Sequence, residues 1–439
     1  MLVALGWLFQ QPAIAEELLL TNAHIVDPKA HKVRTGALLI RDGVIVGAPV
    51  RAPRNFAGQV LNLKGKWIIP GLNDLHTHSF GNPPFMADGD TPGTASISTR
   101  VLAAGVTGML DLFGDENGLD QVRSQQRLGK LEGADLYASL SCLTAPKGHC
   151  TEYGVPTRTL TTPEQARSVV ADLAMKHPDV IKIVYQPSGP MPSIDKATLA
   201  AAVSEASRNG LKTILHIDTW GEVSDAIDVG ASAVTHIPDE PLSDALARRM
   251  AQSGIAFMPT IAVEIDWMNF ASDPEVLDNP MARSMTKPGV LAAYRTEEYL
   301  NKIKASRAAD DAHSKVVLAN VKKAADAGVK ILLGTDAGNW GTLQGYSVHR
   351  ELVLMVNAGL TPWQALASGT TSAGNFLGRR WGVSVGDQAN LVVLDASPIA
   401  DITNTQSIDM VIHHGKIVDR QALLASPAAG LVVPLVKAP

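Results

Sequence analysis

Histidine, lysine and aspartate side chains stand at the ends of successive apolar runs of this chain. His76 and His78 close the first such run, and on an extended strand two residues separated by one neighbour share a face. Later runs carry or end in further side chains of the same kinds, Lys182, His216, His236 and Asp336. Neutral imidazole and carboxylate are suitable ligands for Zn²⁺ and similar ions. The pattern therefore predicts a metal centre that two ions could share.

Each of these residues also has an ordinary explanation when it is taken alone. A single strand-end histidine is more often a hydrogen-bonded structural residue than a ligand, and Thr335-Asp336 could cap a helix. Lys182 could extend its ammonium group to the end of its strand. The joint pattern favours a site, because the histidines and Asp336 all fall at the same end of their apolar runs.

Lys182 lies within the apolar run DVIKIVYQ, residues 179 to 186, which predicts a buried strand. A buried ammonium group is costly unless it is paired or neutralised. If CO₂ adds to the amine, the product is a carbamate, an anion whose two oxygens could bridge two metal ions. Carboxylation of Lys182 is thus one chemical solution to its burial.

Eight apolar runs alternate with helical patterns in the middle of the chain. Several of these helices end in a glycine, the usual helix stop, as at Gly105 and Gly210. The alternation implies parallel strands in a closed (β/α)8 TIM-like barrel, where all carboxyl ends meet on one face. An open doubly wound sheet is the alternative, although no glycine-rich phosphate loop follows any run. The runs are KWIIPGL, VTGMLDLF, ADLYASL, DVIKIVY, KTILHI, SAVTHI, IAFMPT and VKILLGT.

The two ends of the chain show short strands and turns instead, with Asp42-Gly43 as a hairpin signal. We therefore expect an α/β protein in which a small β-sandwich is built from both chain ends. The predicted divisions are a signal peptide at 1–15, sandwich segments at 16–66 and 386–439, and the barrel at 67–385. The long connection after IAFMPT is either part of the substrate enclosure or a surface elaboration.

Composition excludes several classes of partner. The 439 residues are 46% hydrophobic and 18% charged, with a net charge of −5 and no lysine or arginine cluster, which argues against nucleic-acid binding. No apolar stretch is long enough for a stable membrane span. The start of the chain ends in Ala13-Ile14-Ala15, as at a signal-peptidase site, although lysine and arginine are missing near Met1.

We therefore expect an exported protein, periplasmic or secreted, or a cytoplasmic one if this stretch is not a signal. Export would permit a disulfide between Cys142 and Cys150, the two cysteines of the chain, but two free thiols remain an alternative.

The whole constellation resembles the amidohydrolase superfamily in its binuclear, carboxylated-lysine form. Within that superfamily it is most similar to the imidazolonepropionase-like and Xaa-Pro dipeptidase-like branch. The resemblance covers nearly the whole chain and is carried by NLKGKWIIPGLNDLHTH at 62–78, GTDAGN at 334–339, HRELVLMVNAGLTPWQALASGTTSAGNFLG at 349–378 and ANLVVLDASPIADI at 389–402.

This resemblance implies two divalent metal ions, expected to be zinc, and a role for each matching residue. His76, His78 and Asp336 would bind the buried metal, and His216 and His236 the more exposed one. Carboxylated Lys182 would bridge the two metals together with a hydroxide, and Asp336 would be the catalytic residue that moves the proton. His149 and Tyr185 are the candidate substrate-binding residues, although the sequence YQPSGP departs from the small residues common in this branch.

The implied activity is metal-dependent hydrolysis of amide bonds, as in Xaa-Pro dipeptides, N-acyl amino acids or cyclic amides. Hydrolysis of lactones, carbamates or organophosphate esters on the same centre is the alternative. In a mononuclear deaminase Lys182 would have no role. A metal-free scaffold protein is disfavoured because all six ligand positions of the family carry residues that can bind metal. The resemblance further implies a small-molecule or short-peptide substrate and is compatible with a homo-oligomer.

Overall fold

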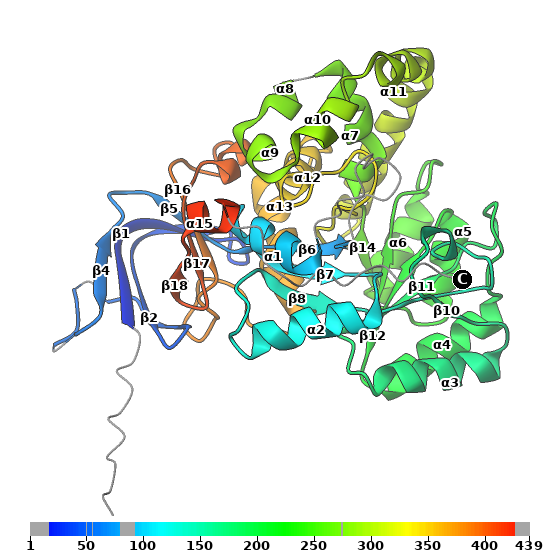
Figure 1. Ribbon diagram of the computed structural model, residues 1–439, viewed down its shortest axis with the longest axis horizontal. Coiled ribbons are helices and arrows are strands. Elements are labelled where there is room, and N and C mark those ends of the chain that lie inside the picture. The colour runs from blue at the N-terminus through cyan, green and yellow to red at the C-terminus, as the bar shows by residue number, and fades with distance from the viewer. Residues whose placement is uncertain (1–16, 50, 55, 80–92, 274, 426–439) are drawn as a thin grey trace, which may run out of the picture.

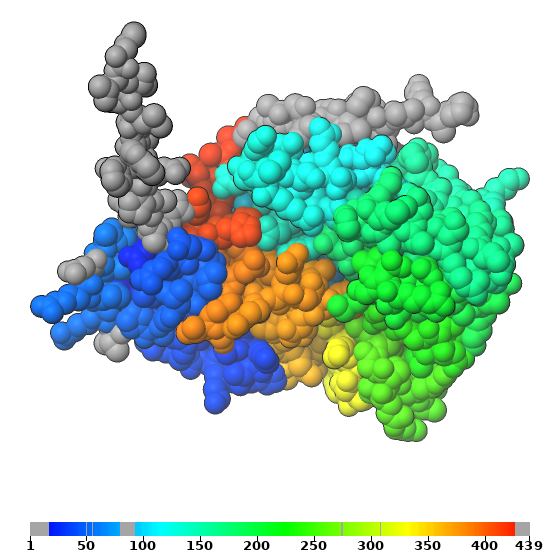
Figure 2. Space-filling model, turned by 90° about the horizontal axis from the view of Figure 1, so that it is seen from below, coloured from blue at the N-terminus to red at the C-terminus, as the bar shows by residue number. Residues whose placement is uncertain are grey.

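The computed structural model describes residues 17–49, 51–54, 56–79, 93–273 and 275–425. Within them, the chain forms one eight-stranded sheet at one end of the molecule and a larger α/β body beside it (Figure 1). Figure 2 shows the N-terminal strands packed beside C-terminal segments at that end, so the two ends of the sequence meet in space. The predicted signal peptide lies outside the described residues.

The eight-stranded sheet takes strands from both ends of the chain. Along it the order is β18-β17-β16-β5-β1-β2-β3, and β4 pairs with β1. Alternate residues of these strands, such as Leu18, Leu20, Leu391 and Val393, share one buried cluster. The strands are β1 Glu17–Asp27, β2 Lys32–Arg41, β3 Val44–Gly47, β4 Gln59–Asn62, β5 Trp67–Pro70, β16 Leu391–Leu394, β17 Ile408–His413 and β18 Lys416–Ile417.

The position of β5 corrects one predicted boundary. We placed the start of the barrel at residue 67, but β5 pairs in parallel with β1 and antiparallel with β16. Residues 67–70 of the run KWIIPGL therefore belong to the eight-stranded sheet, and the first strand of the α/β body is β6, Leu72–Thr77. Gly71 separates the two, and a Cβ there would meet the Thr107 side chain at 2.0 Å.

The α/β body is built on two parallel sheets. One has the order β6-β7-β8 and the other β10-β9-β11-β12-β13-β14-β15. Backbone hydrogen bonds join the two, from Leu75 N to Leu333 O (3.0 Å) and from Asp179 N to Ala138 O (2.9 Å). The remaining strands are β7 Val106–Asp111, β8 Asp135–Ala138, β9 Cys142–Thr144, β10 Arg158–Thr159, β11 Val180–Val184, β12 Lys212–His216, β13 Ala233–Thr235, β14 Ala256–Met258 and β15 Lys330–Ile331.

Helices follow most of these strands, as the alternation in the sequence predicted, and their caps agree with local sequence. Thr162 accepts a hydrogen bond from Gln165 N at the start of the helix that opens with Pro163. The helices of the body are α1 Thr94–Ala103, α2 Glu116–Arg127, α3 Pro163–Ala174, α4 Lys196–Arg208, α5 Trp220–Asp228, α6 Asp244–Ser253, α12 Tyr346–Asn357, α13 Pro362–Gly369, α14 Thr371–Phe376 and α15 Arg420–Ala425. Among the described residues, no helix is both long and apolar enough to cross a membrane.

The long connection between β14 and β15 forms a helical layer of its own. It contains α7 Ile261–Ser272, α8 Glu275–Asp278, α9 Pro280–Met285, α10 Pro288–Ala293 and α11 Glu297–Asp326. Buried polar contacts hold α7 to α12. The Glu351 carboxylate accepts hydrogen bonds from Ile261 N (2.9 Å) and Ala262 N (2.7 Å), and Arg350 donates two to Asp266 (3.0 and 2.8 Å). This layer is therefore fixed to the body beside the strand ends.

The Asp266–Arg350 pair gives a stability prediction. Asp266 is fully buried, so Asp266→Ala leaves the guanidinium of Arg350 buried without its carboxylate. We expect the free energy of unfolding to fall by about 3–5 kcal/mol, measured by chemical denaturation. The exposed pair Lys322–Asp326 provides the control, since Asp326→Ala should cost less than about 1 kcal/mol. Equal losses in the two variants would show that the buried pair does not hold α7.

Candidate metal centre

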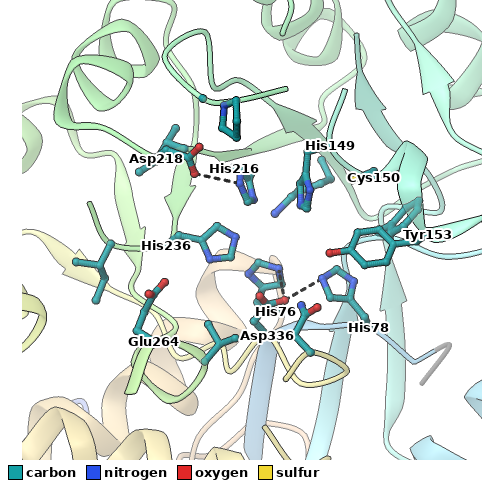
Figure 3. Close-up of a pocket in the computed structure, with 18 of the residues that line it drawn as sticks. His76, His78, His149, Cys150, Tyr153, His216, Asp218, His236, Glu264 and Asp336 are labelled. Atoms are coloured by element: carbon teal, nitrogen blue, oxygen red, sulfur yellow. Dashed lines mark ion pairs between the residues drawn. The ribbon is translucent and has the colours of Figure 1, made fainter. Parts of the chain in front are cut away.

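A cavity of about 580 Å³ opens where the carboxyl ends of the parallel strands meet. Figure 3 shows histidine side chains from different strands pointing into it around Asp336. All six predicted metal ligands line this cavity, His76, His78, Lys182, His216, His236 and Asp336. The residues that the sequence analysis singled out on different strands are thus brought together in one cavity of the folded chain.

Asp336 lies at the centre of the cluster. Its Oδ1 is 3.2 Å from His76 Nε2 and 2.9 Å from His78 Nε2. Ligand atoms of His76, His236 and Asp336 all lie within 4.8 Å of one another, close enough to hold one metal ion. The ring centroids of His216 and His236 are 4.3 Å apart, which continues the cluster toward the cavity mouth.

Threonine hydroxyls fix the orientation of two of these rings. His76 Nδ1 is 2.7 Å from Thr235 Oγ1, and His236 Nδ1 is 3.1 Å from Thr260 Oγ1. With Nδ1 engaged, Nε2 of each ring is left for the cavity. Hydrogen bonds of this kind commonly orient metal-binding histidines. The donor set therefore fits the divalent metal ions that the sequence predicted.

The backbone is strained at three successive strand ends of the site. His236, Thr260 and Asp336 have positive φ angles of 78°, 52° and 57°. Such conformations are uncommon for residues with a Cβ and cost on the order of 1–3 kcal/mol each. These residues follow β13, β14 and β15, and the side chains of His236 and Asp336 enter the cavity there.

The carboxylate of Asp74 ties the first strand of the body to the last. It accepts hydrogen bonds from His76 N (3.2 Å), Thr335 N (3.0 Å) and Thr335 Oγ1 (2.6 Å). Burial raises the pKa of Asp74 to about 7, and the three donors oppose that rise. The residues on either side of this link, His76 and Asp336, both face the centre.

Burial keeps the imidazoles of His76, His216 and His236 uncharged. It lowers the pKa of His76 and of His236 well below the ordinary value, and that of His216 to about 4. Neighbouring Lys182 and the other histidines lower these pKa values further. Neutral imidazole is the form that binds metal, so the protein presents ligands ready for it at neutral pH.

Lys182 lies in the buried environment that the apolar run around it predicted. Its side chain is buried, and its Nζ has no hydrogen-bond partner among the described residues. Burial lowers the pKa of Lys182 to about 7, although Asp336 opposes this. A large share of the amine is therefore unprotonated at neutral pH, the form that reacts with CO₂.

The two predicted substrate contacts differ in their positions. His149 lines the cavity, with its ring centroid 4.7 Å from that of His216, and its Nδ1 lies 2.6 Å from Glu152 Oε1. Tyr185 does not line it. Its hydroxyl donates a hydrogen bond to Asp225 Oδ2 (2.7 Å) on α5, so its predicted substrate role is wrong for this structure.

Several other residues of the cavity were missed by the sequence analysis. Asp218 follows His216 by two residues, a spacing that could have been noticed. Tyr153 comes from the short 3₁₀ segment Thr151–Tyr153, and Glu264 from the first turn of α7. Neither has a signal in the sequence, because each depends on how a connection folds back over the strands.

Cys142 and Cys150 form a disulfide. It joins β9 to the loop that carries His149, and Cys150 itself lines the cavity. Of the two alternatives left open by the sequence, the structure has the bonded one.

Parallel strands alternating with helices place a histidine-rich centre at their carboxyl ends, in a protein of the α/β class. Residues 67–418 match the amidohydrolase family, and the chain belongs to it. This confirms the resemblance drawn from the motifs, including the similarity to imidazolonepropionases and Xaa-Pro dipeptidases.

Individual relatives are distant. The imidazolonepropionase of Deinococcus radiodurans is 24% identical over 408 residues, covering 85% of this chain and 89% of its own. The structure of a Xaa-Pro dipeptidase with bound methionine superposes with a TM-score of 0.74 at 20% identity, covering 92% of this chain and all of the other. A putative prolidase from Bifidobacterium longum gives a TM-score of 0.70 at 25% identity, covering 94% and 99%.

The depressed pKa of Lys182 predicts a pH dependence of stability in chelator-treated protein. Between the folded pKa of about 7 and the unfolded value near 10.5, the unfolded chain binds more protons than the folded one. The wild type should therefore gain stability relative to Lys182→Met as pH rises through this window. Melting temperatures of both proteins at pH 6 and pH 9 measure the effect. A constant difference between them would contradict the assigned environment of Lys182.

Proposed function

We propose that this protein hydrolyses amide bonds of small molecules or short peptides with the help of two divalent metal ions, expected to be zinc. The observation that supports this most directly is the convergence of His76, His236 and Asp336 within metal-ligand distance, beside the unpaired amine of Lys182. Dipeptides such as Xaa-Pro, N-acyl amino acids and cyclic amides are the candidate substrates. Membership of the amidohydrolase family supports the reaction class.

The residues present fit two metal positions. His76, His78 and Asp336 would hold the inner ion, His216 and His236 the outer one, and carboxylated Lys182 would lie between them. Bound there, the ions would lower the pKa of a water molecule and polarise the scissile carbonyl. A carbamate would also turn the buried cation of Lys182 into an anion that faces positive charge.

Asp336 is proposed as the group that moves the proton. Its carboxylate would take a proton from the attacking water and return it to the leaving amine, so that one residue serves as base and then as acid. His149 is proposed as a hydrogen-bond donor to the substrate, since it lines the cavity and Glu152 holds its Nδ1.

Three wider features belong to the same proposal. The hydrogen bonds between the two parallel sheets support a closed (β/α)8 barrel, with the eight-stranded sheet folded as the predicted sandwich. The disulfide supports export, because disulfides persist in oxidising compartments. A homo-oligomer remains a proposal that rests on the family alone.

Asp336→Asn tests the proposed chemistry. Amide nitrogen cannot accept the proton, so we expect kcat to fall roughly 10²–10⁴-fold with the fold retained. The assay is amine release from a mixed library of dipeptides and N-acyl amino acids, with Zn²⁺ and bicarbonate supplied. Metal content is measured in parallel to separate loss of proton transfer from loss of metal.

The exposed Asp311→Asn serves as the matched control and should leave the rate unchanged. A near-normal rate in Asp336→Asn would overturn the proposed mechanism. Wild-type activity that survives chelation would overturn the metal-dependent reaction itself.

A further inference from the structure

Three acidic side chains that do not belong to the predicted metal ligands line the cavity. They are Asp218, Asp239 and Glu264. Each follows a different strand, since Asp218 comes after β12, Asp239 after β13, and Glu264 lies in α7 after β14. Figure 3 shows Asp218 and Glu264 on the side of His216 and His236, opposite Tyr153 and His78. The cavity therefore has an acidic side and a side with an aromatic residue.

Basic groups do not balance this acidic side. Among the described residues that line the cavity, Lys182 is the one lysine, and there is no arginine. The amine of Lys182 is buried beside the predicted metal ligands, so it is not available to pair with a substrate carboxylate. Among these described lining residues, a substrate carboxylate would thus find no guanidinium or free ammonium, the groups that usually recognise it.

His313 on α11 offsets only part of the negative charge. Its Nδ1 lies 3.0 Å from Asp239 Oδ1, and its Nε2 lies 3.5 Å from Glu264 Oε2. The contact with Glu264 raises the pKa of His313, and burial raises that of Glu264. Two carboxylates therefore share a single imidazole as their basic partner.

Asp218 adds a third carboxylate, at the mouth of the cavity. Its Oδ1 is 3.4 Å from His216 Nε2. Its side chain is 41% exposed, so it faces the open part of the cavity. A Cβ on Gly189 would approach Asp218 Oδ2 to 3.0 Å, and the absence of a side chain there leaves this carboxylate accessible.

We propose that the acidic side of the cavity binds a positively charged group of the substrate. The inference rests on the proposed function and narrows it: the preferred amides carry an ammonium or guanidinium group and no free carboxylate. An aminoacyl amide with a free amine fits this description. An N-acyl amino acid, which brings a carboxylate and no cation, does not.

The test uses matched analogues of whichever amide the library assay identifies. Three analogues share the scissile bond and differ only in a terminal ammonium, carboxamide or carboxylate group. We expect kcat/KM to be about tenfold higher for the ammonium than for the carboxamide, and lowest for the carboxylate, because like charges repel. The preference should shrink as salt is raised.

Glu264→Gln identifies the residue responsible. It should lower the ratio of kcat/KM between the ammonium and carboxamide analogues toward one, and taking a ratio cancels any general damage to the enzyme. Glu298→Gln, at an exposed position in the first turn of α11 and outside the cavity, should keep the ratio of the wild type.

Equal rates for the three analogues, or fastest cleavage of the carboxylate, would overturn the inference while leaving the proposed function intact. If no amide is cleaved at all, the proposed function fails, and the inference is then tested separately by titrating the protein with butylammonium and with butyrate. Tighter binding of butylammonium, weakened in Glu264→Gln, supports the acidic side as a cation site, and tighter binding of butyrate refutes it.

Discussion

The hydrogen bonds of Asp74 are the interaction on which the site depends. This buried carboxylate joins β6 to the segment after β15, the first and last parallel strands of the body, by accepting from His76 N, Thr335 N and Thr335 Oγ1. His76 and Asp336 are next to these contacts in the chain. The relative position of the residues at the centre is therefore set by a link between segments about 260 residues apart.

Burial and backbone geometry together explain why these side chains stay in place. Burial keeps the imidazoles of His76, His216 and His236 neutral, and Thr235 and Thr260 orient two of these rings. The backbone of His236 and Asp336 is left-handed where their side chains enter the cavity. Lys182 has no hydrogen-bond partner among the described residues in this setting. Conversion to a carbamate, with metal ions bound nearby, would offset the cost of its burial.

The sequence predicted the parts of the structure that follow from local chemistry. Positions at or near the strand ends were enough to bring the six predicted ligands together, because parallel strands direct their carboxyl ends to one face. The alternation of side chains between the two faces of a strand also explains why Tyr185 does not line the cavity, as its predicted substrate contact would require. It stands three residues after Lys182, so its side chain leaves the opposite face of the strand and reaches Asp225 instead of the cavity.

Features that depend on tertiary folding could not be predicted in this way. The strand at residue 67 has the apolar character of a barrel strand, and only its pairing with β1 and β16 assigns it to the other sheet. Tyr153, Asp239 and Glu264 reach the cavity from connections whose paths no periodicity describes. The acidic lining of the cavity therefore became apparent only from the folded chain.

Metal content per chain is the measurement that tests the central claim most directly. The protein would be purified with Zn²⁺ and bicarbonate, and its metal counted by mass spectrometry in parallel with Lys182→Met. The account predicts about two divalent ions per chain in the wild type and fewer in the variant. A wild type that holds no divalent metal, or an unchanged count in Lys182→Met, would contradict it.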